Sequence, residues 1–281
     1  MVHYIQHQDK NAGPADYEGL SPLLRVTKIF YTIQGEGPYA GHPAVFVRLA
    51  GCNRGQKEGM GCEFCDTSFE LENSMSMTVE QVVKAVRECA PEKTIEDDRF
   101  SSVKVLAYPY SLVVITGGEP MLQPMLPHLC RALQEAGGGL TVQIESNGDN
   151  IQRPFIDGPY PLRSTVKLVV SPKVTKGVYR EPRVGYINRV DAFKFVVSAD
   201  TDSPYFSVPA WATQEEVRGK VYISPLTVYK RAVRFGEVPN MWDSGLIDRE
   251  ATMRNYKHAS DICMECGFRF SCQTHLFMGQ E

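Results

Sequence analysis

The feature that most constrains the fold is a regular alternation of strand-like and helix-like segments beyond about residue 23. Short runs rich in Val, Ile and Phe, typical of buried strands, cover 24–31, 44–50, 111–116, 141–144, 166–170, 193–197, 221–223 and 269–274. Helical periodicity covers 78–89, 125–136, 213–220 and 247–259. This alternation predicts an α/β fold with a mostly parallel sheet and covering helices.

Two of these helices carry end signals. Thr78 and Gln81 are spaced as a capping box at the start of 78–89. Pro127 is tolerated in the first turn of 125–136, and Gly137 is a stop signal at its end.

Length and charge limit the classes of protein. A chain of 281 residues with 43% apolar and 22% charged residues is compatible with one α/β domain. We expect a flexible arm at 1–22 and a single domain at 23–281. A net charge of −3 gives no sign of the excess positive charge that binds nucleic acid. The apolar runs are too short to span a membrane.

Three of the eight cysteines, Cys52, Cys62 and Cys65, form a C-x9-C-x2-C group. Three thiolates without a fourth leave one metal coordination position open, which is typical of chemical rather than structural sites. Considered alone, the spacing favours zinc, or no metal, over an iron–sulfur cluster. Eight cysteines are too few for a disulfide scaffold in a chain of this length, and their clustering indicates metal ligands in a reducing cytoplasm.

A second group, Cys263, Cys266 and Cys272, has C-x2-C-x5-C spacing and could suggest another metal site. We instead expect Cys272 to belong to a last strand at 269–274. Cys89 and Cys130 fall in helical segments and are expected to be buried thiols.

A glycine pair follows the strand at 111–116, in the run TGGEP at 116–120. Glycines at a strand end allow a sharp turn and let backbone amides approach a ligand. Cys52, Gly117, Ser146, Ser171 and Ser224 each follow a predicted strand, so their functional groups should meet at the carboxyl end of a parallel sheet.

The cysteine triple followed by GGEP resembles radical S-adenosylmethionine (SAM) enzymes, and further motifs resemble the 7-carboxy-7-deazaguanine synthase (QueE) family. These motifs are TIQGEG at 32–37, FVRL at 46–49, CDT at 65–67, ESNG at 145–148, SPK at 171–173, KFVV at 194–197 and QTH at 273–275. The resemblance implies an incomplete (βα)6-type radical SAM barrel with reduced helical cover. It also implies a lyase that converts 6-carboxy-5,6,7,8-tetrahydropterin to 7-carboxy-7-deazaguanine with loss of ammonia, in 7-deazapurine (queuosine-type) biosynthesis.

The resemblance also assigns site residues. Cys52, Cys62 and Cys65 would hold a [4Fe–4S] cluster whose open iron binds SAM, and the reduced cluster would release a 5′-deoxyadenosyl radical from it. Thr67 would bind Mg²⁺. The expected SAM-binding residues are Gly118, Ser146, Ser171, Pro172, Lys173, Ser224, Pro225 and Leu226, and the expected substrate-binding residues are Ile33, Gln34, Gly35, Glu36, Arg48, Thr116, His275 and Glu281.

The chemistry of Arg48 fits this substrate independently, because a guanidinium binds a carboxylate with two parallel hydrogen bonds. Two departures from the family pattern stand out. The gap between Cys52 and Cys62 is longer than the usual three residues, which predicts a remodelled loop at 53–61, and SPL at 224–226 replaces a common Gln-Pro-Met.

Two other functions fit parts of the sequence. A radical SAM activase acting on a protein partner would share the cluster and GGEP but leave Arg48 and the QTH run unexplained. A non-enzymatic zinc-binding module would use the cysteines alone. Family analogy further predicts a homodimer and an electron donor such as flavodoxin.

Overall fold

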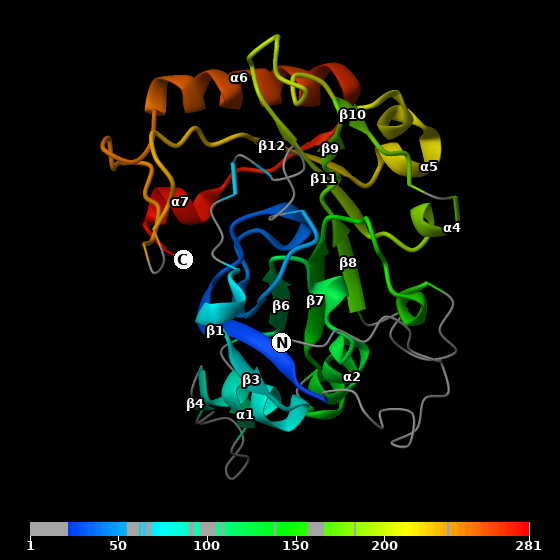
Figure 1. The fold of residues 1–281 in the computed structure, drawn as a ribbon, viewed down its shortest axis with the longest axis vertical. Helices are drawn as coiled ribbons and strands as arrows, with labels where there is room; N and C mark the ends of the chain where they lie inside the picture. The colour runs from blue at the N-terminus through cyan, green and yellow to red at the C-terminus, as the bar shows by residue number, and fades with distance from the viewer. Residues whose placement is uncertain are drawn as a thin grey trace.

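The fold is that of a computed structural model (Figure 1), and it places functional groups at one end of a curved sheet. The structure describes residues 22–54, 62, 64–65, 69–89, 93–95, 105–107, 110–137, 139–156, 166–182, 184–234 and 237–280. The predicted arm at 1–22 lies outside the described residues except for its last position.

One nine-stranded sheet organises the described chain, in the order β13-β12-β11-β8-β7-β6-β2-β1-β3. Every neighbouring pair from β2 to β13 is parallel, whereas β1 pairs antiparallel with β2 and β3. The strands are β1 (Leu24–Ile33), β2 (Pro43–Leu49), β3 (Met75–Met77), β6 (Leu112–Gly117), β7 (Thr141–Ser146), β8 (Val166–Val170), β11 (Ala192–Val197), β12 (Val221–Pro225) and β13 (Arg269–Phe270). Six consecutive parallel strands, β2 to β12, form the predicted incomplete barrel.

Two small hairpins lie outside this sheet, β4 (Lys93–Ile95) with β5 (Val105–Ala107), and β9 (Val174–Thr175) with β10 (Val178–Tyr179). Short 3-10 helices are η2 (Gly37–Tyr39), η3 (Leu71–Asn73), η4 (Pro120–Leu122), η5 (Arg153–Phe155) and η6 (Ala210–Thr213).

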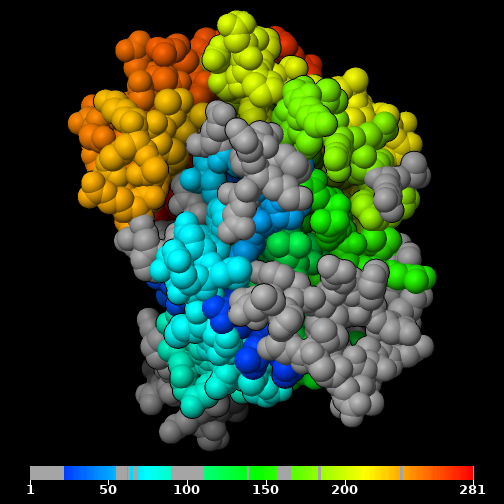
Figure 2. Space-filling model, in the orientation of Figure 1, coloured from blue at the N-terminus to red at the C-terminus, as the bar shows by residue number. Residues whose placement is uncertain are grey.

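Helical cover is uneven, as predicted. The α-helices are α1 (Val79–Cys89), α2 (Leu126–Glu135), α4 (Val184–Ile187), α5 (Glu215–Arg218), α6 (Arg249–Cys266) and α7 (Thr274–Met278). Figure 1 shows α6 and α7 at one end of the molecule and α1 with β3 at the other, and in the space-filling view (Figure 2) the C-terminal part of the chain, yellow to red, forms the upper part of the visible face. Among the described helices, none is both long and apolar enough to cross a lipid bilayer.

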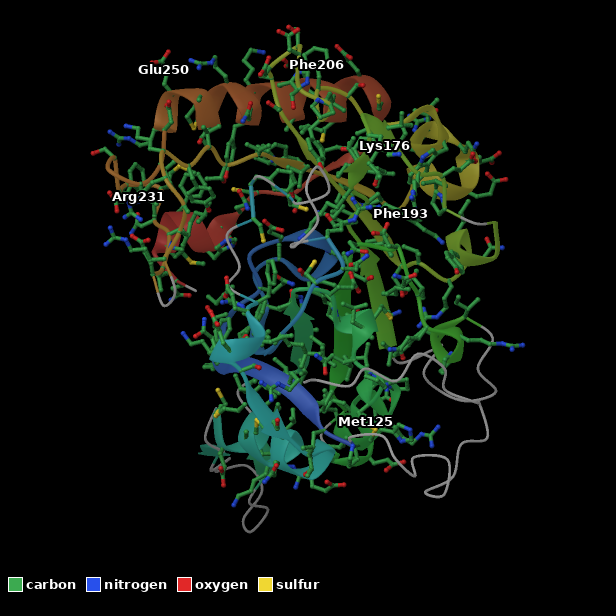
Figure 3. The ribbon with its side chains drawn as sticks, viewed as in Figure 1. Met125, Lys176, Phe193, Phe206, Arg231 and Glu250 are labelled. Atoms are coloured by element: carbon green, nitrogen blue, oxygen red, sulfur yellow. The ribbon has the colours of Figure 1, made fainter. Side chains whose placement is uncertain are left out.

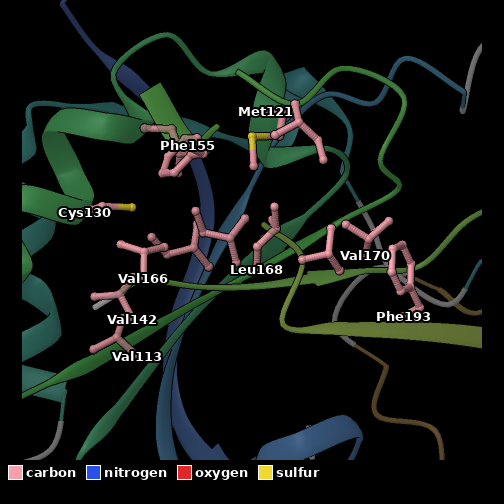
Figure 4. Packing of buried hydrophobic residues seen from close by; sticks show 14 of the residues in the cluster. Val113, Met121, Cys130, Val142, Phe155, Val166, Leu168, Val170 and Phe193 are labelled. Carbon is pink, nitrogen blue, oxygen red and sulfur yellow. The ribbon is translucent and has the colours of Figure 1, made fainter. Parts of the chain in front are cut away.

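The parallel strands bury an apolar outer face against the helices. Val113, Val142 and Val166 are register neighbours on β6, β7 and β8, all fully buried, and they line up in the core (Figure 4). Side chains alternate along a strand, so the positions between them face inward. There a small apolar cluster around Ala44 and Leu112 fills one end of the barrel and leaves polar side chains at the carboxyl end.

The helix signals were confirmed. Thr78 N–H donates to Gln81 Oε1 at 2.8 Å, and Gln81 N–H donates to Thr78 Oγ1 at 3.2 Å, so the capping box forms. Gly137 has φ +89°, the left-handed conformation that favours glycine after a helix. The helix predicted at 247–259 extends to Cys266, where left-handed Gly267 ends it.

Two predicted elements were wrong in part. The last strand, expected at 269–274, ends at Phe270, because Thr274 donates from its N–H and its hydroxyl to the carbonyl of Gly35 and begins α7. The helix expected at 213–220 is divided between η6 and the four-residue α5, because Gln214 adopts an extended conformation between them.

Replacing Leu129 by Ala should lower the free energy of unfolding by about 2–5 kcal/mol, because Leu129 in α2 is fully buried in the outer core. Urea unfolding followed by circular dichroism measures the change. The control Met264→Ala in α6, where Met264 is 74% exposed, should cost little. Equal losses in both variants would contradict this description of the core.

Candidate functional site

A cavity of about 290 Å³ opens at the carboxyl ends of the parallel strands. Fourteen of the predicted site residues line it: Ile33, Gln34, Gly35, Glu36, Arg48, Cys52, Cys62, Cys65, Thr116, Gly118, Ser146, Ser171, Lys173 and His275. Pro172, Ser224, Pro225 and Leu226 are not among its lining residues. Thr67 and Glu281 lie outside the described residues.

Two glycines bring the turn after β6 against the first cysteine. Gly117 has φ +131°, and a Cβ on it would overlap the backbone of Leu49. A Cβ on Gly118 would overlap the carbonyl of Gly51 and lie 3.0 Å from Cys52 Cβ. The Glu119 N–H donates to Gly51 O at 2.8 Å, which completes the contact. Only glycines permit this approach.

The three cysteines share one wall of the cavity. Cys52, Cys62 and Cys65 form no disulfide bond, and the Cys65 N–H donates to Cys62 O at 3.0 Å. No three Cys, His, Asp or Glu side chains within the described ranges could hold a single metal ion. Each thiolate of a cubane cluster binds a different iron, so three cluster ligands need not converge on one point.

The second cysteine group does not gather either. Cys263 is buried in α6, where burial and then Cys266 raise its pKa to about 11. Cys272 Sγ lies 3.7 Å from the hydroxyl of Tyr256. Both features favour neutral thiols in apolar packing over metal ligands.

A buried charged group forms the floor of the cavity. Lys194 on β11 is 8% exposed; its ammonium contacts the Glu36 carboxylate and lies 3.6 Å from Glu145 Oε2. Burial alone would raise the pKa of Glu36, but Lys194 and His275 outweigh it and lower that pKa to about 2. Gln34 donates to Glu145 Oε1 at 3.0 Å and accepts from the Glu36 N–H at 3.2 Å. These groups form one hydrogen-bonded unit.

Arg48 is held on an aromatic pair. Its guanidinium carbon lies 5.2 Å from the centre of the Phe30 ring, which stacks on Phe46 at 5.3 Å. Arg48 pairs in register with Thr116 on β6, so both side chains belong to the inner face. A guanidinium fixed on a ring face still presents N–H groups at its edge for a carboxylate.

Ser146 is committed to internal contacts. Its hydroxyl donates to Glu119 Oε1 at 2.8 Å and accepts from the Gly148 N–H at 3.0 Å. Glu119 is fully buried and also accepts from the backbone N–H groups of Met121 and Asn147. Burial outweighs these hydrogen bonds and raises the pKa of Glu119 to about 7. Glu119 thus joins the glycine turn to the loop after β7.

Lys173 and Ser171 line the cavity close to Phe64, the residue before Cys65. Lys173 Nζ donates to Ser171 Oγ at 2.6 Å and lies 5.6 Å from the centre of the Phe64 ring. Burial lowers the pKa of Lys173, while Cys62 acts in the opposite direction.

Ser224 does not line the cavity: its hydroxyl donates to Ser271 O at 3.2 Å, and the residue is 2% exposed. The Leu226 N–H donates to Val197 O at 2.8 Å and continues the β11–β12 pairing. The Ser224 hydroxyl and the Leu226 N–H are therefore both committed to contacts within the fold.

Several cavity residues were missed from the sequence: Arg54, Glu145, Lys194 and Glu237. Glu145 and Lys194 fall within motifs quoted above, and their inward position in alternating strands was the available signal. Two N–H groups of Arg231, labelled in Figure 3, bond Glu237 at 2.6 and 2.8 Å, and these bonds lower the pKa of Glu237 to about 2. No local sequence pattern predicts the Arg231–Glu237 ion pair.

Known proteins are similar to this chain in sequence and in fold, although no protein-family model matches it. The 7-carboxy-7-deazaguanine synthase of Rickettsia prowazekii is 33% identical over 258 residues, 92% of this chain and 89% of that protein. Its namesake in Rhodospirillum rubrum is 37% identical over 214 residues, 76% and 74% of the two chains. The one in Hyperthermus butylicus is 35% identical over 274 residues, 92% and 94%.

A crystal structure of QueE from Escherichia coli covers 93% of this chain and 98% of its own, with a TM-score of 0.54 and 18% identity. At that identity the structural match establishes the radical SAM fold alone. The sequence matches establish more: this chain belongs to the 7-carboxy-7-deazaguanine synthase family.

Replacing Gly118 by Ala should displace the Gly51 carbonyl and Cys52, because the added Cβ overlaps both residues. We expect a loss of about 1–3 kcal/mol in the free energy of unfolding and less iron bound after anaerobic reconstitution. Gly185→Ala is the control, since a Cβ there meets open space. Equal iron content in the two variants would refute the close approach.

Replacing Lys194 by Met should reverse the pH dependence of stability that Glu36 provides. With a pKa of about 2 against an ordinary 4.5, ionised Glu36 stabilises the fold above pH 4.5, and this stabilisation is lost as the pH falls toward 2. Without Lys194, burial, which is the largest influence on Glu36, raises its pKa above the ordinary value against the remaining effect of His275, so stability is lost as the pH rises.

Thermal unfolding midpoints from about pH 3 to about pH 8 test this reversal. Lys84→Met, which removes an exposed partner of Glu88, should leave the profile of the native protein unchanged. Parallel profiles for Lys194→Met and the native protein would show that Lys194 does not control Glu36.

Proposed function

We propose that this chain is a radical SAM lyase that converts 6-carboxy-5,6,7,8-tetrahydropterin to 7-carboxy-7-deazaguanine with loss of ammonia. Membership of the family supports this reaction. One observation carries the proposal: the cysteine wall, the glycine turn, Arg48 and the Glu36–Lys194 floor all line a single cavity.

The residues fit a [4Fe–4S] cluster and SAM. Cys52, Cys62 and Cys65 would bind three irons, and the close packing of Gly118 against Gly51 and Cys52 brings the backbone of the glycine turn beside the first of these ligands. Together these groups would supply a radical that abstracts hydrogen from the substrate. Ser171 and Lys173 would contact SAM with their side chains. Backbone atoms would make the contacts at Gly118, Pro172, Pro225 and Leu226. Ser146 and Ser224 would support the SAM site through the internal contacts described above.

Substrate recognition follows from the charges in the cavity. Arg48 would bind the carboxylate of the pterin, and Thr116 lies beside it in register. Glu36, Gln34 and the backbone of Ile33 and Gly35 would accept and donate hydrogen bonds along the pterin edge.

The closing residues and the metal complete the proposed site. His275 packs against Gly35, since a Cβ on that glycine would overlap the imidazole, and it would contact the substrate. Thr67 would bind Mg²⁺, which would supply a hard cation for oxygen atoms of the substrate. Glu281 would contact the pterin.

The chain's own contribution to the reaction is orientation. Arg48, fixed on Phe30, holds one end of the substrate, and ionised Glu36, fixed by Lys194, holds the other. Two anchors at opposite ends fix the reacting carbon toward the cysteine wall and prevent rotation. The apolar rings of Phe30, Phe46 and Phe69 exclude water from that side.

We propose that the enzyme works in a reducing cytoplasm, as a homodimer that receives electrons from a donor such as flavodoxin. The spacing of the cysteines, which is typical of metal ligands rather than disulfides, supports the reducing compartment. The dimer and the donor rest on family analogy.

The test is incubation of the anaerobically reconstituted protein with the carboxylated pterin, SAM and a reductant. We expect a 7-deazaguanine product and 5′-deoxyadenosine. Cleavage of SAM without that product would favour an activase acting on a protein, and tightly held zinc without SAM binding would favour a zinc module.

Replacing Arg48 by Lys should raise KM for the pterin by about tenfold or more, because an ammonium cannot make two parallel hydrogen bonds to a carboxylate. Lys28→Met is the matched control. Lys28 lies 5.3 Å from the same Phe30 ring but does not line the cavity. A KM unchanged in Arg48→Lys, or raised equally in the control, would remove Arg48 from substrate binding.

A further inference from the structure

Arg54, two residues after Cys52, is buried with only 2% of its side chain exposed. Its Nε and Nη2 donate to the two oxygens of Asp149 at 2.6 and 2.7 Å, and its Nη1 donates to Val174 O at 3.2 Å. Val174 begins the β9–β10 hairpin, whose turn carries Lys176 (Figure 3). One guanidinium therefore joins the loop after β2 to the loops after β7 and β8.

A second set of contacts runs beside this pair. Asn53 Nδ2 donates to Asp149 Oδ2 at 2.9 Å, and Asn147 Nδ2 donates to Asn53 Oδ1 at 2.8 Å. The Asp149 N–H donates to Asn147 Oδ1 at 2.9 Å, which closes the turn. The amides thus fix the same two loops independently of the charges.

These contacts form a closed ring around Cys52. From Asp149 the ring continues to Asn147, whose N–H donates to Glu119 at 2.7 Å. The Glu119 N–H donates to Gly51 O, one residue before Cys52. The backbone on both sides of Cys52 is therefore held, by Glu119 before it and by Asp149 after it.

A buried ion pair adds little net stability compared with apolar residues of the same size, but it penalises every arrangement that separates its charges. Such a pair is suited to specifying one geometry. The planar guanidinium strengthens this selection, because both of its bonds to Asp149 require one orientation.

We propose that Arg54 and Asp149 are positioning residues that lock the first cysteine loop onto the loop after β7, so that Cys52 and the SAM-binding turns are aligned together. This inference rests on the proposed function for the role of Cys52. It gives the start of the long cysteine loop a specific role: residues that do not bind the cluster align Cys52, the first cluster ligand.

The primary test uses the full chain without cluster, under reducing conditions. The rate at which N-ethylmaleimide labels each cysteine is measured by peptide mass spectrometry in the native protein, Arg54→Lys and Asp149→Asn. We expect Cys52 to react about tenfold faster in both variants because its loop opens more often. Labelling of the fully buried Cys130 should not change.

Arg189→Lys is the matched control. Arg189 is 5% exposed and also binds an aspartate, Asp191, at 3.2 Å, but it does not line the cavity. This variant should leave the Cys52 rate unchanged. Equal Cys52 rates in the native protein and Arg54→Lys, or an equal acceleration in Arg189→Lys, would overturn the proposal.

If both charged variants lose their circular dichroism signal, Asn53→Ala decides, because it removes the Asn53 hydrogen bonds to Asp149 and Asn147 and leaves the buried charges of Arg54 and Asp149 paired. A faster Cys52 reaction in this variant supports the locked loop, and an unchanged rate overturns it.

A second measurement, on reconstituted protein, is SAM affinity by calorimetry, expected to fall about tenfold in Arg54→Lys. If the native reconstituted protein binds no SAM, the proposed function fails, while the labelling experiment still tests the loop.

Discussion

The two-residue alternation of side chains along six parallel strands is the constraint from which the rest of the molecule follows. One face of β6, β7 and β8 is apolar and packs against the helices, which supplies the core. The side chains at the alternate positions point to the other face of the sheet. Toward the carboxyl ends of the strands, these residues are Arg48, Thr116, Glu145 and Lys194. Charges inside a barrel have little water to solvate them, so they must find partners. The pairing of Lys194 with Glu36 and Glu145 answers that need and at the same time shapes the cavity.

Much of the fold could be predicted because its signals are local. The apolar runs of the parallel strands and the capping box at Thr78 need only neighbouring residues to be recognised. The end of the chain could not be predicted in the same way. Thr274 bonds to Gly35, 239 residues away, and this contact replaces a strand with a helix. No pattern within 269–274 contains that information.

The site shows the same division. Motifs led to Gln34, Glu36 and the cysteine wall, because residue types that bind ligands stand next to glycines and strand ends. Arg54 and Asp149 were missed because neither residue stands in a recognisable pattern. Their role becomes visible only in the structure, where Arg54 Nε lies 2.6 Å from Asp149 Oδ2. Ser146 was identified as a direct ligand from its place in a motif, whereas its hydroxyl is engaged by Glu119 and Gly148.

The contact between Gly35 and the segment around Thr274 and His275 has a consequence for biosynthesis. Gly35 lies close to the beginning of the described chain, and the ring that packs on it belongs to the last helix. Domains can begin to fold while the ribosome is still at work, but this wall of the cavity cannot form until residue 275 has left the exit tunnel. A nascent chain therefore lacks this wall until nearly all of the described residues have been synthesised.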